Sequence, residues 1–232
     1  MAEKLSLKDQ CLEDLKARIL KMELRPGTPL EETPLCQQYG LSRTPMREVF
    51  QRLAGAGFIS LSPGRGAEVA EIELARLRQF FQSAPLLHAL IAKQAAENID
   101  PVGLDALKVA QAAARRARVS RNAAAMALAD YGFHFAVCQV SGNPYLGPSL
   151  ARLLIDQTRM SVAFYSGHSA ADNARIDHAL AEHERLIEAI SHQQAKHAVA
   201  LAIQHWDGVK GHVETYVQPA PLADEAGLLD DL

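Results

Sequence analysis

Residues 41–69 read LSRTPMREVFQRLAGAGFISLSPGRGAEV, and this stretch decides the fold of the N-terminal part of the chain. Its first half has apolar residues at steps of three and four, the spacing of an amphipathic helix: Met46, Val49, Phe50 and Leu53. After Gly57 the pattern changes to a short β-prone run from Phe58, then to turn residues 63–66 and a returning strand at Val69. The stretch therefore predicts a helix followed directly by a β-hairpin.

Two further helices are predicted before this stretch. Apolar residues recur at helical spacing across residues 12–22, and the run Arg25-Pro26-Gly27 stops that pattern. Thr33 can cap a short second helix that ends at Gly40, and Ser42 can cap the third helix. Three helices and a hairpin make a winged helix-turn-helix, in which the third helix enters the major groove of DNA.

The third helix carries a polar row suited to reading DNA. The row consists of Arg43, Arg47 and Gln51, at positions i, i+4 and i+8. Thr44 lies at the helix start, where its hydroxyl and free backbone amides can meet phosphate oxygens, and Arg65 lies at the hairpin tip. Residues 43–66 hold four Lys and Arg against one Asp or Glu, whereas residues 1–72 hold ten of each. The alternative is that these arginines only solvate a surface helix.

The rest of the chain is predicted to be helical. Beyond Ile72 the composition shifts to Ala, Leu and Gln, without a convincing strand pattern. Breaks fall near residues 100–101, 141–144, 166–168 and 192, and about six helices are expected in residues 73–217, a number that suits an antiparallel bundle. The fold class is thus mainly α, with a winged helix-turn-helix domain at residues 1–72 and a helical domain at residues 73–217. The acidic, Pro-containing residues 218–232 are expected to form a mobile tail.

The overall composition bears on the cellular compartment and on the partners of the protein. A net charge of −3 excludes a globally basic nucleic-acid binder, so any DNA contact must come from local charge. Three widely spaced cysteines fit a reducing compartment. The N-terminus lacks an apolar signal core, and no stretch approaches the ~20 apolar residues that span a bilayer. We therefore expect a cytoplasmic protein that makes no membrane contact.

Four polar residues of the helical part could form a metal site. Asp130 and His134 are four residues apart and project from one helix face. His183 lies in a later helix and His205 in the last, so a bundle could bring all four side chains together. One carboxylate with three imidazoles favours a divalent transition metal such as Zn, Ni, Mn or Fe. The alternative is a chance pattern, because the chain has nine histidines and Glu182-His183 could be a surface pair.

Residues 8–72 resemble the DNA-binding domain of the GntR family of bacterial repressors and activators. The most specific part is LSRTPMRE at residues 41–48, followed by leucine and glycine spacing through Gly57. The resemblance implies operator contacts from the third helix and the wing tip: Arg43, Thr44, Arg47, Arg65 and Gly66. One departure is Thr33-Pro34, where relatives often carry charged residues, so a phosphate contact from the second helix is not implied.

Residues 74–215 resemble the FCD ligand-binding domain of the FadR-type GntR subfamily. Three segments carry this resemblance: residues 130–134 with 141–144, residues 182–190, and residues 204–205. The resemblance implies that Asp130, His134, His183 and His205 hold a divalent metal. It also implies that the remaining coordination sites are open to water or to the carboxylate of an effector.

The first helix of this domain departs from the family pattern. An R-x-x-L-E pattern is usual there, but residues 82–87 read QSAPLL, and Pro85 could kink the helix. If the arginine of that pattern normally binds the carboxylate of the effector, this chain needs a different cation for that contact. The candidates for effector binding are Arg152, Arg159 and Asn143.

These observations predict a bacterial transcriptional regulator, a repressor or an activator, that binds operator double-stranded DNA. A small-molecule effector, expected to be a carboxylate bound near the metal, would modulate this binding. A homodimer is expected because two recognition helices on successive major-groove turns require two-fold symmetry. A metal-responsive regulator without an organic effector is the alternative. A metalloenzyme is a weaker one, because no nucleophile elbow, phosphate loop or cofactor glycine motif accompanies the metal ligands.

Overall fold

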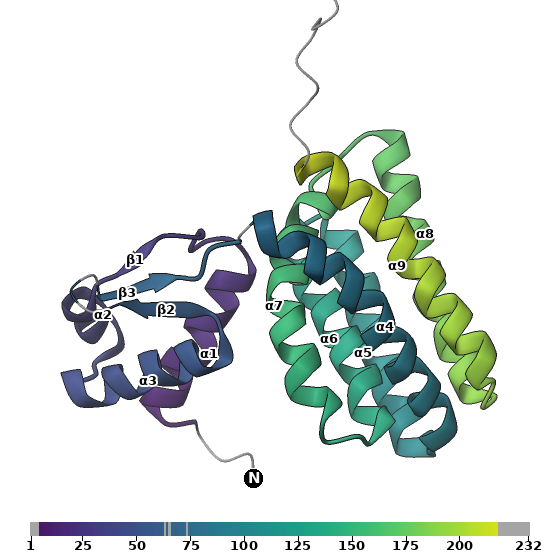
Figure 1. Ribbon diagram of the computed structural model, residues 1–232, viewed down its shortest axis with the longest axis horizontal. Helices are drawn as coiled ribbons and strands as arrows, with labels where there is room; N and C mark the ends of the chain where they lie inside the picture. The colour runs from purple at the N-terminus through teal and green to yellow at the C-terminus, as the bar shows by residue number, and fades with distance from the viewer. Residues whose placement is uncertain (1–4, 63, 65, 73, 218–232) are drawn as a thin grey trace, which may run out of the picture.

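The computed structural model describes residues 5–62, 64, 66–72 and 74–217. Figure 1 shows two parts side by side: a small N-terminal part with a sheet, and a larger part made of long helices. The elements of the N-terminal part are α1 (Leu7–Leu20), β1 (Pro29–Leu30), α2 (Glu32–Tyr39), α3 (Arg43–Ala56), β2 (Ile59–Ser62) and β3 (Gly66–Val69). The strands pair antiparallel in the order β1-β3-β2. This is the predicted winged helix-turn-helix.

The N-terminal part folds around the predicted apolar stripes. Its core includes six side chains at most 1% exposed: Leu12, Leu15, Ile19, Met46, Val49 and Leu53. Gly40 and Gly57 end α2 and α3 in the left-handed conformation, with φ of 65° and 88°, which glycine adopts at little cost. The predicted Thr33 cap is wrong, because α2 begins at Glu32 with Glu31 as its N-cap residue. Strand β1 was not predicted.

Within the described residues the larger part consists of six helices, in agreement with the predicted number of about six. They are α4 (Leu74–Asn98), α5 (Pro101–Ser120), α6 (Ala123–Ser141), α7 (Leu146–Tyr165), α8 (Ala170–Ser191) and α9 (Ala195–Val217). Helix α6 packs against α4, α5 and α7, and α9 packs against α4 and α8. Side chains from α4, α6, α7, α8 and α9 therefore meet in one core.

The helix boundaries follow local signals. Asp100 and Ser169 cap α5 and α8 by accepting backbone N–H bonds, at two of the predicted breaks. A further break, between α5 and α6, was not predicted; there Arg121 has a φ of 51° and Asn122 caps α6. Pro85 lies inside α4 without ending it. The predicted tail, residues 218–232, lies outside the described residues, and no helix among those described is long and apolar enough to cross a membrane.

Helix α7 joins the two parts. Ile155 is buried in the hydrophobic cluster of the N-terminal part. The Arg159 guanidinium donates a 2.6 Å hydrogen bond from Nη1 to the carbonyl oxygen of Ala70, in the segment between β3 and α4, and pairs through Nη2 with Asp156. The Arg159 side chain is 0% exposed, whereas the Arg152 side chain, which also pairs with Asp156, is 46% exposed. The buried guanidinium of Arg159 thus holds the segment between β3 and α4, the linker of the two parts, against the helical part.

We expect Arg159→Met to lower the free energy of unfolding by about 2–3 kcal/mol, because it removes charge-assisted hydrogen bonds at a buried position. The loss of stability is limited because the Asp156 side chain is 22% exposed, so water can hydrate its carboxylate once the guanidinium is removed. Arg152→Met, which removes an exposed partner of the same carboxylate, should cost less than about 1 kcal/mol. Urea unfolding followed by circular dichroism measures both values, and equal losses would show that Arg159 does not hold the junction.

Candidate functional site

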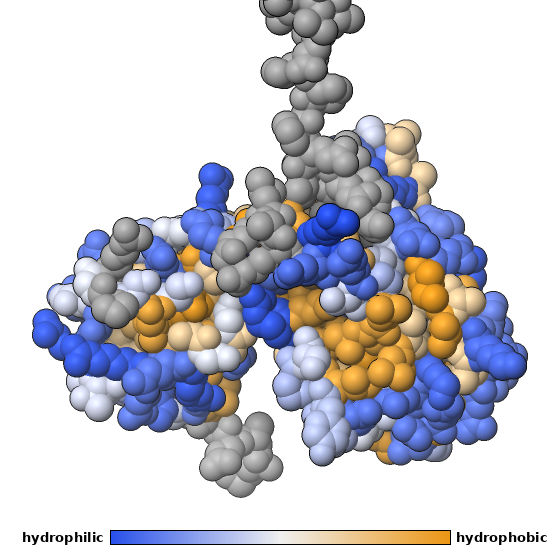
Figure 2. Space-filling view, in the orientation of Figure 1, coloured by the Kyte–Doolittle hydropathy of each residue, from blue (hydrophilic) through white to orange (hydrophobic). Residues whose placement is uncertain are grey.

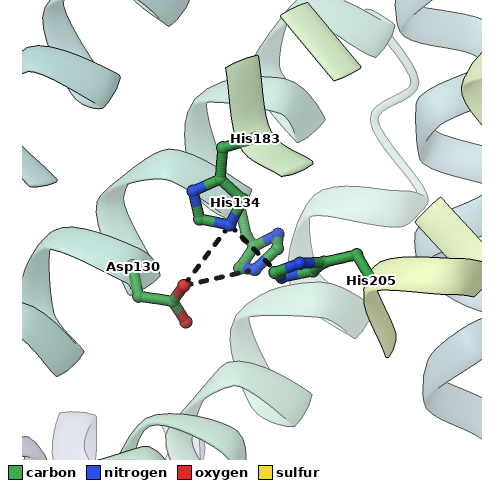
Figure 3. Close-up of side chains that lie close together, drawn as sticks. All are labelled: Asp130, His134, His183 and His205. Carbon is green, nitrogen blue, oxygen red and sulfur yellow. Dashed lines mark hydrogen bonds and ion pairs between the residues drawn. The ribbon is translucent and has the colours of Figure 1, made fainter. Parts of the chain in front are cut away.

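Three helices bring the four predicted metal ligands to one point in the helical part. Helix α6 supplies Asp130 and His134, α8 supplies His183 and α9 supplies His205. Figure 3 shows the four side chains converging, and one ligand atom from each lies within 4.8 Å of the others. Oδ1 of Asp130 is 3.6 Å from Nε2 of both His134 and His183, and Nε2 of His183 is 3.2 Å from Nε2 of His205. All four residues are buried.

The electrostatics of this cluster suit a cation. Burial lowers the pKa of His134 and of His183 well below the usual value, so both rings are neutral and keep a lone pair for a metal. Burial also raises the pKa of Asp130 to about 6, against the opposing effects of His205 and a hydrogen bond from Tyr165. Nε2 of His134 has no hydrogen-bond partner among the described residues. The donor set therefore fits a divalent transition metal.

Neighbouring side chains orient the ligands. The Tyr165 hydroxyl donates to Asp130 Oδ1 at 3.1 Å, and Oε2 of Glu182 lies 3.0 Å from Nδ1 of His205. The contact between Glu182 and Nδ1 of His205 leaves Nε2 of that ring facing the cluster. A carboxylate commonly orients a metal-binding histidine in this way. The His183 ring also stacks on Phe133, with centroids 3.9 Å apart. Sequence reasoning missed Tyr165, and its alternative of a surface Glu182-His183 pair is wrong because both residues are buried.

A small cavity of about 20 Å³ lies beside the cluster. Its polar lining comes from His88, His134, His205 and Trp206, and its apolar lining from Ile91, Ala92, Val137, Leu186 and Ala202. His88 is buried, and its Nε2 lies 3.0 Å from Oε1 of Gln157. The volume is enough for about one water molecule.

The three predicted effector residues lie away from this cavity. Arg152 and Arg159 pair with Asp156 near the domain junction. Asn143 contacts Gln94, with its Nδ2 3.1 Å from Oε1, and accepts a bond from the backbone N–H of Tyr145. None of the three is among the residues that line the cavity.

Three of the predicted DNA-reading residues line one groove of the N-terminal part. Arg43, Thr44, Arg47 and Gln51 are all exposed on α3. Arg47 Nε donates to Oε2 of Glu32 at 3.2 Å. A groove of about 660 Å³ runs between α3 and the wing, and Arg47, Gln51 and Gly66 are among its lining residues. The predicted contact residue Arg65 lies outside the described residues.

Comparisons with known proteins match both parts of the chain. Residues 7–69 match the family described as bacterial regulatory proteins, gntR family, and residues 80–208 match the FCD domain. The HTH-type transcriptional repressor RspR of Escherichia coli K12 is 34% identical over 85 residues, a match that spans 37% of each protein. The galactonate operon transcriptional repressor of the same strain is 26% identical over 215 residues, covering 84% of this chain and 91% of the repressor.

A solved structure shares the whole fold. The Escherichia coli McbR/YncC structure superposes with a TM-score of 0.78 over 93% of this chain and 100% of that one, at 20% identity. The two described parts therefore occur together in the same arrangement of elements in that protein.

Proposed function

This chain belongs to the GntR family of bacterial transcriptional regulators and carries an FCD domain, and on that basis we propose a metal-containing, effector-responsive repressor. The observation that carries the proposal is the buried cluster of Asp130, His134, His183 and His205, in the same chain as a winged helix-turn-helix. Repression is inferred from the two relatives named above, both described as repressors. The family comparisons identify the chain as a regulator and not an enzyme.

In this proposal residues 1–72 read the operator. Exposed Arg43, Arg47 and Gln51 would contact base edges or phosphates, Thr44 would contact a phosphate at the start of α3, and the wing with Arg65 and Gly66 would reach an adjacent groove. The groove between α3 and the wing contains Arg47 and Gly66 on opposite sides, which supports a single contact face.

Residues 73–217 would hold the metal and the effector. The four ligands would bind a divalent metal, which when bound would offer a Lewis-acidic site for the carboxylate of an effector. Tyr165 and Glu182 would keep Asp130 and His205 in the orientation that binds the metal.

A homodimer is part of the proposal. Figure 2 shows a broad hydrophobic area on the front of the helical part, where α4 lies in Figure 1. On α4, Leu86 is 72% exposed and Leu90 is 41% exposed. Exposed apolar areas of this kind commonly mark association surfaces, and two-fold pairing would supply the second recognition helix.

Helix α7 offers a physical connection between effector and operator sites. Near the cluster, its Tyr165 bonds to Asp130 and its Gln157 bonds to His88. Toward the DNA-reading part, its Ile155 is buried in the N-terminal core and its Arg159 bonds to the linker. An effector that binds one position of α7 more tightly than another would shift the arrangement of the DNA-reading parts.

The metal-responsive alternative has one observation in its favour, because the cavity beside the cluster has room for only about one water molecule.

A test that separates the two functions uses the full-length protein and an operator selected from a pool of random DNA duplexes. Fluorescence anisotropy then measures operator affinity with Zn²⁺ bound, with Zn²⁺ removed by a chelator, and with short carboxylates added to the Zn²⁺ form. We expect carboxylate to weaken operator binding about tenfold or more while Zn²⁺ stays bound, the usual size of an allosteric coupling. A change in operator affinity with Zn²⁺ alone would favour the metal sensor. If the selection enriched no DNA duplex, the proposal that the protein is a DNA-binding regulator would be overturned.

A further inference from the structure

A cleft of about 570 Å³ lies between the N-terminal part and the helical part. Helix α1 and the residues around the end of α3 form one wall, and α6 and α7 form the other. Figure 1 shows α7 on the side of the helical part that faces the N-terminal part. None of the four residues of the metal cluster is among the described residues that line this cleft. Its volume accommodates a small organic molecule, and ligand sites often lie between domains.

Small residues line much of the cleft. Helices α1 and α7 each supply one alanine, and α3 supplies two neighbouring small residues: Ala17, Ala151, Gly55 and Ala56. A Cβ atom added at Gly55 would meet no atom within 4 Å, so open space lies directly against α3. Larger apolar side chains complete this lining: Leu20, Phe58, Leu128 and Ile155. A flat apolar molecule could therefore lie against these surfaces and leave water.

Arg152 supplies unused hydrogen-bond donors at this cleft. Its Nη1 bonds to Asp156 at 3.0 Å, whereas its Nε and Nη2 have no hydrogen-bond partner within the described part of the chain. Its Nε lies only 2.6 Å from the position that a Cβ atom of Gly57 would occupy. Gly57 lies between the lining residues Ala56 and Phe58. The side chain therefore reaches from α7 to the end of α3, with two N–H groups of its guanidinium available to a ligand.

The charges at the cleft favour an anionic ligand. Among the described residues that line it, the charged ones are Glu13, Lys16 and Arg152. Lys16 Nζ pairs with Glu13 at 2.8 Å, so these two charges balance. Arg152 shares the carboxylate of Asp156 with Arg159, so two guanidinium groups and one carboxylate carry a net charge of +1. An anionic group that binds Arg152 would balance this charge through charge-assisted hydrogen bonds.

Tyr131 adds a polar group on the α6 side of the cleft. Its ring stacks on Phe135, with centroids 6.0 Å apart, and its hydroxyl has no hydrogen-bond partner among the described residues. Burial raises the pKa of Tyr131, and so does Glu13 on α1, which shows that this side chain faces the N-terminal part. The hydroxyl stays protonated and can donate to a ligand.

We propose that this cleft is a second ligand site, separate from the metal cluster, and that it binds a small organic anion with a flat apolar body. The anionic group would accept hydrogen bonds from Nε and Nη2 of Arg152, and the apolar body would lie against Gly55 and Ala151. Such a ligand contacts both parts, so it would favour one position of the DNA-reading part. Only this effect on operator binding rests on the proposed function; the binding step does not.

Isothermal titration calorimetry of the purified full-length protein tests the ligand class with three probes. β-Naphthoate has both the charge and the flat body, β-naphthylmethanol keeps the body without the charge, and acetate keeps the charge without the body. We expect saturable binding of β-naphthoate. The dissociation constants of the other two should be at least about tenfold higher, because each lacks one of the two contributions. A variant with His134→Ala and His183→Ala should bind β-naphthoate within about threefold of the wild type.

Two glycine variants locate the site. Gly55→Leu places a side chain in the open space of the cleft, at a position without a positive φ, and should weaken β-naphthoate binding at least about tenfold. Gly132→Leu is the matched control, because a Cβ atom there also meets no atom within 4 Å but Gly132 lines a different groove, between α5 and α6. It should leave the dissociation constant within about threefold. Both changes replace a helical glycine, so thermal unfolding should show both variants to be at least as stable as the wild type.

Arg152→Met separates the anionic contact from the apolar one. It should weaken β-naphthoate binding about tenfold or more, as for a lost hydrogen bond to a charged group, and leave β-naphthylmethanol within about threefold. The effect on DNA is measured by fluorescence anisotropy on the selected operator. Saturating β-naphthoate should change operator affinity about fivefold or more for the wild type, the lower end of allosteric couplings, and should have no effect on Gly55→Leu.

Several results would overturn the inference. These are no saturable binding of β-naphthoate, equal binding of β-naphthylmethanol, unchanged binding in Gly55→Leu or Arg152→Met, or equal losses in the two glycine variants. Loss of binding in the His134 and His183 variant would place the ligand at the metal cluster instead. Unchanged operator affinity with β-naphthoate bound would refute the regulatory role of the cleft. The proposed function fails differently, if the wild type holds no Zn²⁺ or selects no operator, and the calorimetry at the cleft requires neither.

Discussion

Replacing His134 and His183 together by alanine should abolish tight Zn²⁺ binding and the stabilisation that the metal provides. The two rings come from α6 and α8, and their Nε2 atoms both lie 3.6 Å from Asp130 Oδ1. Removing both would leave one carboxylate and one imidazole, too few ligands for a stable site. Inductively coupled plasma mass spectrometry of the dialysed protein should show Zn²⁺ near one per chain for the wild type and near zero for the variant.

The same variant should lose the thermal response to metal. A metal present at a hundred times its dissociation constant stabilises the folded state by about 2.7 kcal/mol. For a protein of this size that amounts to a rise in the unfolding temperature of roughly 5–10 °C. Differential scanning fluorimetry with and without Zn²⁺ should show this rise in the wild type and not in the variant.

A matched control removes two histidines that lie elsewhere. His168 and His197 are both exposed, and neither belongs to the cluster. His168→Ala with His197→Ala should keep full metal content and the full thermal response. Full Zn²⁺ occupancy in the His134 and His183 variant would refute the assigned ligands, and metal loss in the control would point to a surface site.

The sequence predicted the parts of the site that depend on one helix and left open those that depend on packing. Asp130 and His134 could be paired from their spacing because one helix turn brings i and i+4 together. His183 and His205 could be proposed because a bundle can bring later helices beside α6, and the resemblance supported this assignment, since no local pattern says which helices of a bundle are neighbours. Tyr165 contacts Asp130 across 35 residues of sequence, and Trp206 could not be linked to a cavity before α4 and α9 were placed together.

The errors in the predicted fold have equally local causes. Strand β1 consists of two residues, Pro29 and Leu30, and exists only because β3 lies beside it. The break between α5 and α6 contains no glycine or proline. Arg121 adopts the left-handed conformation there, and Asn122 is the N-cap residue of α6. The sequence signal for this break was Asn122, because asparagine is a common N-cap residue of helices. Thr33 had the right chemistry for a cap, but α2 begins at Glu32 without any side-chain cap bond.

Arg47→Ala should reduce operator affinity about a hundredfold or more while leaving the fold intact. The bond from Arg47 to Glu32 uses Nε, so within the described part of the chain no hydrogen bond engages its two Nη nitrogens. Those nitrogens could bind guanine O6 and N7 or a phosphate, and a good bidentate base contact is worth about 1–3 kcal/mol. In a dimer each half-site would lose this contact, so the two losses add. Fluorescence anisotropy on the selected operator measures the effect.

Arg52→Ala is the matched control, because Arg52 lies on the same helix but pairs with Asp9 near the start of α1 at 2.9 Å. Its loss removes the same charge from α3, so a merely electrostatic role for arginine on this helix would weaken both variants equally. We expect Arg52→Ala to stay within a few-fold of the wild type on the operator, and both variants to bind unrelated duplex with similar affinity, since base contacts specify and phosphate contacts do not. Unchanged operator binding by Arg47→Ala would mean that α3 does not read DNA through Arg47.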